Sequence, residues 1–471
     1  MEFNSFNTQT KLIPALFTPW IASIYLDYNP IASYFIAWTG SLVIFYLSIF
    51  SGLSPCNSQR PFRLQVMRPI IIIQLIFAGF MCSSSIFYFF NQIDDLSEES
   101  ILLAASDEQI ILIAQCQRYT LLAHAALVTG IVVVRPPQSL KKYTLKKTPH
   151  LVIKLAFSAI TCSSILNYIP GLSQFKYPLY NISIACTIYL LIRGLKKGAV
   201  RDWLPGLLLF IYQLFNAAST GYKEVIIVQF ILLIFMAFPY YPKITALAAP
   251  ICALLLLYIL PTFTGIIRTQ AWILGKKPQE ARTNAYQIFL EHTEGDLILN
   301  NSKEFLDSRI SEMDMFIQYV KYNTDHQELT LQQMILQSLY ALIPKMIWAD
   351  KPSTEKIAME RVYRFGVVNR DSPVSAKTRP VVDGYLMGGA AGIFIYMFCY
   401  GITCQFLCNT SVKLFGGHQL GCCIIFNSIF QPLWRGNNIE FLLNNLCYGI
   451  ILLLIIHQFM IITKTITKNP L

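Results

Sequence analysis

The sequence contains few charged residues, because Asp, Glu, Lys and Arg together occupy only 13% of its 471 positions. That is about half the usual share for a soluble domain. Hydrophobic residues account for 54% of the chain instead. Apolar runs of about 18 residues or more recur along it, and this is the length that crosses a hydrocarbon core of roughly 30 Å. The composition therefore predicts an all-α polytopic membrane protein.

Cysteine is missing from one long segment, since all 12 cysteines fall outside residues 268–383. Almost all of them lie in apolar runs, where cysteine is most simply a small packing residue. The loops contain no CxxC pair, and the histidines form no metal-ligand motif such as HExxH. The sequence thus predicts neither a metal site nor another cofactor, and the large segment needs no disulfide.

Twelve apolar segments are candidate membrane spans. They lie near residues 12–27, 31–53, 69–91, 110–134, 149–168, 177–194, 203–220, 223–240, 243–267, 384–409, 418–434 and 439–462. The first residues, MEFNSFNTQTK, lack the basic region and the cleavage site of a signal peptide, so we expect the first span to be retained. The chain then divides into transmembrane helices 1–9 over 1–267, a large loop over 268–383, and transmembrane helices 10–12 over 384–471.

Lys and Arg gather in alternate short loops, at 60–68, 135–147 and 193–201, and an acidic loop at 94–108 lies between the first two. Because basic residues accumulate on the cytoplasmic side, the pattern predicts cytoplasmic termini and an extracytoplasmic segment 268–383. That segment holds 15 basic and 15 acidic residues, so the net charge of +11 comes from the rest of the chain. The excess therefore reflects topology and the anionic inner leaflet, and we expect no nucleic-acid partner.

The large loop carries helical signals. A short helix is predicted to begin at Pro278 and end at Gly295. Asn301 and Glu304 have the spacing of a capping box at the start of an amphipathic helix over roughly 302–322. An apolar stripe over 331–348 follows, but three glutamines, one lysine and Pro344 make it a poor span. We expect an interfacial or re-entrant helix there, and a thirteenth crossing is the alternative.

The densest extracytoplasmic cluster of positive charge follows this stripe, between residues 350 and 383. Its members are Lys351, Lys356, Arg361, Arg364, Arg370, Lys377 and Arg379. Arginine side chains bind phosphate through two parallel hydrogen bonds, although ordinary salt bridges would explain any single member. Arg435, at the outer end of the predicted span 418–434, is a further candidate, and an interfacial arginine that reaches lipid headgroups is the alternative.

Two motifs resemble the bacterial oligosaccharide repeat-unit polymerases, the Wzy-type O-antigen and exopolysaccharide polymerases. The first is LIPKMIWADKP (342–352) and the second is PVVDGYLMGGAAG (380–392). The similarity covers roughly 300–395, about a fifth of the chain, and includes a helix that carries Arg309. Lys345 stands where the family has arginine, and Asp383 stands where it has glutamate. The matched positions are Ile343, Pro344, Lys345, Trp348, Asp350, Lys351, Pro352, Pro380, Asp383, Tyr385, Gly389 and Gly392.

The resemblance implies a membrane glycosyltransferase of the GT-C kind in the bacterial inner (cytoplasmic) membrane, with its active site on the outer face. Such an enzyme transfers a growing glycan from undecaprenyl diphosphate onto the sugar end of another lipid-linked repeat unit. The partners would be undecaprenyl-diphosphate-linked oligosaccharide, the membrane lipids, and a chain-length regulator and flippase.

Roles for individual residues follow from this implied chemistry. A lipid diphosphate that leaves needs cations to stabilise its developing charge, and the acceptor hydroxyl needs a base within hydrogen-bond reach. We expect Asp383 to be the base, ahead of Asp350 and Asp314. Trp348 and Tyr385 are candidates for stacking on sugar faces, although an interfacial anchor explains Trp348 equally well. The candidate cations are Lys351, Arg364, Arg379 and Arg435, with Arg282 and Arg309 behind them.

Two other functions compete with a polymerase. An O-antigen ligase shares the donor and the large outer loop, but the two motifs favour the polymerase. A lipid-linked oligosaccharide flippase or other transporter often shows internal repeats and broken, charged helices at the membrane midplane. The sequence has no visible repeat, and its polar residues are concentrated in one outer loop. This distribution favours chemistry at the outer surface.

Overall fold

The computed structural model is an all-α protein, 83% helical, with one small two-stranded sheet among the described residues. The predicted fold class is therefore confirmed at this level. The structure describes residues 2–56, 61–94, 108–134, 142–145, 149–166, 168–169, 172, 175–219, 223–270, 274–291, 295–306, 313–326, 331–344, 347–348, 350–370, 376–415 and 437–468.

Seven helical units within these residues are long and apolar enough to cross a membrane. The predicted count of twelve spans stays a prediction, and the segment 418–434 lies outside the described residues. The seven are α2 (Pro30–Ile49), the unit of α3 (Pro69–Ile76), η2 (Phe77–Cys82) and α4 (Ser85–Asp94), α6 (Glu108–Val133), α8 (Lys176–Lys197), the unit of α11 (Pro242–Tyr258) and α12 (Leu260–Arg268), α18 (Pro380–Leu414) and α21 (Ile439–Ile462).

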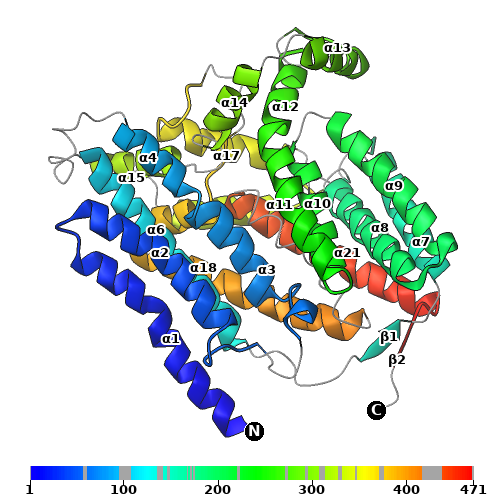
Figure 1. Cartoon of the computed structure of the whole chain (residues 1–471), viewed down its shortest axis with the longest axis horizontal. Coiled ribbons are helices and arrows are strands. Elements are labelled where there is room, and N and C mark those ends of the chain that lie inside the picture. The colour runs from blue at the N-terminus through cyan, green and yellow to red at the C-terminus, as the bar shows by residue number, and fades with distance from the viewer. Residues whose placement is uncertain are drawn as a thin grey trace.

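The membrane helices pack in two groups. Helix α1 (Glu2–Tyr25) joins α2, α6 and α18, while α7 (Pro149–Leu166), α9 (Val200–Ser219) and α10 (Lys223–Ala237) surround α8. In Figure 1 the first group lies to the left and the second to the right, and α21, in red, runs beside both. Helix α21 therefore connects the two groups.

Glycine allows α6 and α18 to approach each other closely. A Cβ atom on Gly130 would lie 2.1 Å from the carbonyl oxygen of Phe398, and one on Gly401 would lie 2.2 Å from that of Leu127. Both positions thus exclude any side chain. Small residues of this kind let membrane helices pack backbone against backbone, so this pair forms a tight seam through the first group.

The two sides of the molecule hold different parts of the chain. Strand β1 (Tyr143–Leu145) pairs antiparallel with β2 (Ile466–Lys468), near the end of the chain. Both chain ends lie on that lower side of Figure 1, whereas α13 (Pro278–Glu291), α14 (Gly295–Glu304) and α17 (Thr354–Arg364) lie on the upper side. The side of the membrane on which the termini and segment 268–383 lie stays a prediction from the charge alternation.

Helix α15 (Met313–His326) attaches the large loop to the ends of α4 and α6. The Tyr88 hydroxyl of α4 donates to Asp314 at 3.3 Å, and Lys321 forms an exposed salt bridge with Glu108 of α6 at 3.0 Å. These contacts hold α15 against α4 and the start of α6.

The start predicted for the helix over 302–322 is wrong, because α14 already contains residues 295–301, and residues 307–312 lie outside the described part of the chain. Helix α14 ends at Glu304 and α15 begins at Met313. The predicted capping box is also wrong, since Asn301 lies inside α14 rather than before its first turn. Tertiary contacts explain the difference, because Asn301 donates to the Thr262 hydroxyl at 3.2 Å and Ser302 donates to the Tyr258 carbonyl at 3.0 Å. These contacts fix α14 against α11 and α12.

Helix α16 (Leu331–Leu342) forms the first part of the predicted apolar stripe. Its 12 residues extend about 18 Å at 1.5 Å per residue, which is too short to cross a membrane alone. The helix ends before Pro344, as predicted, and Leu339 remains 51% exposed. The Trp348 ring contacts Tyr340 edge-on at 5.5 Å between ring centroids. This geometry agrees with an interfacial or re-entrant helix.

Candidate functional site

Helix α18 is broken near its start, within the second motif. Gly388 and Gly389 have non-helical backbone angles, and Gly389 has φ 59° and ψ −139°. Beyond the break the chain lies against its own beginning, because a Cβ atom on Gly392 would lie 2.1 Å from the carbonyl oxygen of Gly384. Residues eight apart in a straight helix are separated by about 12 Å along its axis. Residues 380–387 therefore form a separate short helix, which we call the half-helix.

The sequence explains this break locally. Pro380 occupies the first turn, where its missing N–H is not needed and its fixed φ suits a helix start. Gly389 adopts a left-handed φ that L side chains rarely tolerate. Gly384 and Gly392 leave room for the close contact between the half-helix and the rest of α18. The spaced glycines of the second motif thus allow close packing.

A fully buried ion cluster joins the half-helix to two other helices. Its members are Arg361 of α17, Asp383 of the half-helix and Glu440 of α21. An Arg361 Nη1–Asp383 Oδ1 contact of 3.0 Å and a close salt bridge between Arg361 and Glu440 hold it together. The three side chains are 1%, 0% and 0% exposed. We call this group the ion cluster.

Three further hydrogen bonds complete the cluster. The Thr378 hydroxyl donates to Asp383 Oδ1 at 2.5 Å, and the Ile439 backbone N–H donates to Asp383 Oδ2 at 2.6 Å. Gln337 of α16 accepts from Arg361 Nη2 at 3.2 Å. Because Ile439 is the first residue of α21, Asp383 caps the N-terminus of that helix, where the helix dipole favours a negative charge.

The charges of the cluster stabilise one another. Burial alone would lower the pKa of Arg361, but the carboxylates of Asp383 and Glu440 outweigh it and raise that pKa above its usual value. Arg361 therefore remains a cation inside the protein. A buried charge is tolerated when it is paired and hydrogen-bonded, and this arginine satisfies both conditions.

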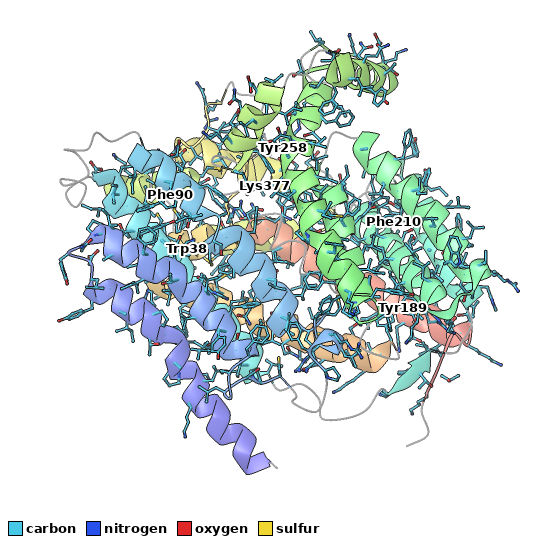
Figure 2. The ribbon with its side chains drawn as sticks, viewed as in Figure 1. Trp38, Phe90, Tyr189, Phe210, Tyr258 and Lys377 are labelled. Atoms are coloured by element: carbon cyan, nitrogen blue, oxygen red, sulfur yellow. The ribbon has the colours of Figure 1, made fainter. Side chains whose placement is uncertain are left out.

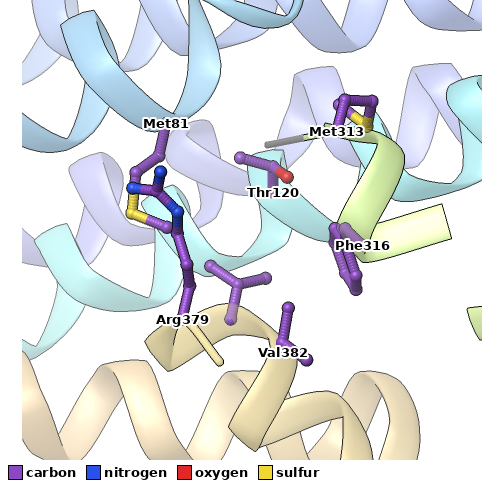
Figure 3. A pocket seen from close by; sticks show the side chains of 7 residues that line it. Met81, Thr120, Met313, Phe316, Arg379 and Val382 are labelled. Atoms are coloured by element: carbon purple, nitrogen blue, oxygen red, sulfur yellow. The ribbon is translucent and has the colours of Figure 1, made fainter. Parts of the chain in front are cut away.

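Arg379 lies immediately before the half-helix and is 6% exposed. Its guanidinium carbon lies 4.2 Å from the ring centroid of Phe80, in η2. Figure 3 shows the side chain extending from the start of α18 toward Met81, with Thr120 and Phe316 across the pocket. The pocket has a volume of about 30 Å³, enough for a water molecule or two. Its full lining is Met81, Thr120, Met313, Phe316, Arg379, Val381 and Val382.

The opposite wall of this pocket also belongs to an irregular helix. Residues Phe77–Cys82 form a π-helix between α3 and α4, and such insertions occur frequently at functional sites. The Gln117 side chain donates to the Cys82 carbonyl at 3.2 Å, and the Trp38 indole donates to the Ser83 carbonyl at 3.0 Å. Irregular backbone at membrane depth requires such internal partners. Two broken helices therefore meet around Arg379.

The structure brings three predicted site residues together. Asp383 belongs to the ion cluster, Arg379 lines the pocket, and Tyr385 lies on the same half-helix. The Tyr385 ring is 8% exposed and contacts Tyr119 and Phe316, at 5.2 Å and 6.1 Å between ring centroids. In this conformation Tyr385 packs against aromatic rings of α6 and α15.

Other predicted site residues lie elsewhere. Lys351 is 7% exposed and donates to the carbonyls of Ala341 and Ile343, at 2.9 Å and 2.7 Å, so it caps the end of α16. Arg364 is exposed at the end of α17, and Trp348 is 36% exposed. Of the remaining candidates, Arg309 and Arg435 lie outside the described residues, and Arg282 belongs to α13.

A family model described as a domain of unknown function (DUF8712) matches residues 18–468. The chain belongs to this family. No curated protein and no solved structure matches it. The matched range includes both broken helices, the ion cluster and the pocket, so the family definition covers the complete candidate site.

Sequence reasoning missed Arg361 and Glu440 as site residues of this family member. Arg361 was one of seven cations in its segment, and nothing in the local sequence separates it from its neighbours. Glu440 offered a signal, because it is the only Asp, Glu, Lys or Arg in α21. Ionisable residues within apolar spans default to functional candidates, and this rule identifies Glu440.

A charged surface surrounds the buried cluster. Lys377 forms a salt bridge with Glu355 at 3.1 Å, and its ammonium lies 3.9 Å from the ring centroid of Phe441. Figure 2 labels Lys377 near the contact between α17 and α21. Arg370 pairs with Glu360 at 2.5 Å, and both side chains are more than half exposed. These pairs are ordinary surface contacts, in contrast to Arg361.

Proposed function

We propose that this chain is a polysaccharide polymerase of the outer face of the bacterial cytoplasmic membrane. It would transfer a growing glycan from undecaprenyl diphosphate onto a lipid-linked oligosaccharide repeat unit. The observation that supports this best is the position of Arg379. A mostly buried cation lies beside an apolar pocket between two broken helices. A cation there would neutralise a lipid diphosphate once the small pocket opens to admit it.

The second motif of the polymerase resemblance forms the half-helix with Asp383. The first motif lies at the end of α16, where Lys351 caps the helix. Gln337, which precedes the first motif on α16, and Asp383 both bind Arg361. The helix that leads into the first motif therefore contacts the cluster that holds the second.

The proposed reaction is a glycosyl transfer. The acceptor hydroxyl oxygen attacks the anomeric carbon of the donor glycan, and a new glycosidic C–O bond forms. The bond between that carbon and the diphosphate oxygen breaks, and the electron pair leaves with the lipid diphosphate. A base removes the hydroxyl proton. Arg379 stabilises the negative charge that develops on the leaving diphosphate.

Asp383 is the candidate base from the sequence, and its surroundings limit how it can act. The carboxylate is completely buried and accepts hydrogen bonds from Arg361, Thr378 and the Ile439 backbone. An acceptor hydroxyl reaches it only if one of these donors moves away. Arg379 therefore supports the proposed function more directly than Asp383 does.

Gene deletion followed by glycan profiling tests the proposal. A polymerase deletion should leave a single capped repeat unit and remove the ladder of longer glycans. Complete loss of capped core would instead identify a ligase, and loss of lipid-linked units from the outer leaflet would identify a transporter. Either result would refute the polymerase assignment.

Complementation then tests Arg379. We expect Arg379→Ala to reduce ladder formation at least tenfold at equal protein level, because the leaving group loses its cation. Arg370→Ala removes an exposed arginine of the same extracytoplasmic segment and should restore the full ladder. A normal ladder from Arg379→Ala would contradict the assigned role.

A further inference from the structure

We propose that the ion cluster is a latch that fixes the half-helix, so that Arg361 and Glu440 are positioning residues for Arg379. The role of the latch in catalysis rests on the proposed function of Arg379. That the ion cluster holds the half-helix in place does not depend on that function.

The half-helix is connected to the rest of α18 through two glycines. Gly388 and Gly389 link it to the remainder of α18 with non-helical backbone angles. Glycine accesses these angles more readily than other residues. A Cβ atom on either glycine would meet nothing within 4 Å, so packing at the link does not fix its geometry. Contacts elsewhere on the half-helix must therefore determine its position.

The close packing of Gly384 against Gly392 and the ring contacts of Tyr385 supply some of those contacts, and the ion cluster supplies the charged ones. Asp383 is the only Asp, Glu, Lys or Arg among residues 380–387. Its carboxylate bonds Arg361 of α17 and the first backbone N–H of α21. Arg361 in turn bonds Glu440 of α21. The half-helix is thus tied to two helices through one side chain, and each tie passes through a buried charge.

The link from the cluster to Arg379 is one helical turn. The Asp383 backbone N–H donates to the Arg379 carbonyl at 2.9 Å. Val381 and Val382 lie between them and line the same pocket as Arg379. A shift of Asp383 therefore moves the Arg379 backbone and this wall of the pocket together. Arg361 and Glu440 would affect Arg379 through this connection without contacting the substrate.

Cysteine labelling measures the position of the half-helix without any substrate. Val382→Cys places a thiol in the pocket wall, where the native side chain is 5% exposed. The purified full-length protein is treated with a hydrophilic maleimide, and labelling is quantified for each peptide by mass spectrometry. Native Cys186, fully buried in α8, serves as an internal control for global unfolding.

We expect Arg361→Ala and Glu440→Gln to increase the labelling rate at residue 382 at least tenfold, while Cys186 stays protected. Arg361→Lys, which keeps the charge, should give a smaller increase. Arg370→Ala, which removes an exposed salt bridge, should give none. Unchanged labelling at residue 382 in both Arg361→Ala and Glu440→Gln would overturn the latch. If Arg361→Ala unfolds the protein and exposes Cys186, the labelling rate at residue 382 in the milder Glu440→Gln variant decides between a latch and no latch.

A second measurement separates positioning from general support of the fold. If Glu440 acts through Arg379, Glu440→Gln should reduce ladder formation in the wild-type background and add little in an Arg379→Lys background. Equal reductions in both backgrounds would refute positioning. A wild-type chain that makes no ladder but shows the expected labelling would refute the proposed function and leave the latch intact. Unchanged labelling at residue 382 in both variants of a chain that polymerises glycan would refute the latch and leave the proposed function intact.

Discussion

Replacing Arg361 by alanine should destabilise the fold far more than replacing any exposed arginine nearby. The guanidinium is 1% exposed and holds two carboxylates that are completely buried. Loss of one partner from a buried salt bridge typically costs about 3–5 kcal/mol, because an uncompensated charge remains inside the protein. A change of about 1.4 kcal/mol is tenfold in an equilibrium constant, so the ratio of folded to unfolded protein should fall by about 2 to 3.5 orders of magnitude.

Arg361→Ala should destabilise the two buried carboxylates to different extents. Asp383 keeps the Thr378 hydroxyl and the Ile439 backbone N–H after the substitution. Glu440 loses both of the side-chain hydrogen bonds that the described structure gives it, since each comes from Arg361. Most of the loss therefore concerns Glu440. Adding Glu440→Gln to Arg361→Ala removes the stranded charge and should recover a large part of the lost stability.

Reversible unfolding of the detergent-solubilised protein, followed by tryptophan fluorescence, provides the measurement. The matched control is Arg370→Ala, because the Arg370–Glu360 pair is 66% and 55% exposed and such pairs contribute about 0–1 kcal/mol. A double-mutant cycle between Arg361 and Glu440 then gives their coupling energy. Equal destabilisation by Arg361→Ala and Arg370→Ala would refute the assignment of a buried, mutually dependent cluster.

Two further substitutions test other parts of the fold by the same unfolding assay. Lys351→Met removes the ammonium that bonds the Ala341 and Ile343 carbonyls, and we expect a loss of about 2–3 kcal/mol; no change would show that the end of α16 needs no cap. Gly401→Ala places a Cβ atom 2.2 Å from a backbone oxygen of α6 and should cost about 1–3 kcal/mol. Gly265→Ala, in α12 with nothing within 4 Å, is its control, and equal effects would contradict the close packing of α6 and α18.

The sequence was sufficient for features that depend on local length and composition. Membrane spans follow from the thickness of the bilayer, and α16 ends before Pro344 because proline interrupts a helix. The predicted span 384–409 nevertheless begins inside the half-helix. Hydropathy depends on residue composition, so it does not detect that the chain reverses its direction at Gly388 and Gly389. Composition averages over residues, whereas the break depends on two backbone angles.

The pairing of Arg361 with Glu440 illustrates what the sequence does not contain. The two residues are 79 positions apart. Arg361 resembles the other cations of its segment, and Glu440 differs from its neighbours only as the single charged residue of an apolar helix. Lys351 was predicted to bind a diphosphate because it is a cation in the first motif. Its observed contacts with the end of α16 depend on how the turn at 350–352 folds back. Such assignments require tertiary structure, because the same residue type suits a ligand or a carbonyl equally well.

The broken helices explain why charge lies inside this apolar protein at all. A helix that is interrupted at membrane depth leaves backbone groups without partners, and these must be satisfied by other parts of the protein. Around η2 the donors are neutral, from Gln117 and Trp38. At the start of α21 the acceptor is the carboxylate of Asp383, and a buried carboxylate requires a cation such as Arg361. The ion cluster therefore supplies the acceptor that the start of α21 requires, and its member Asp383 lies one helical turn from Arg379.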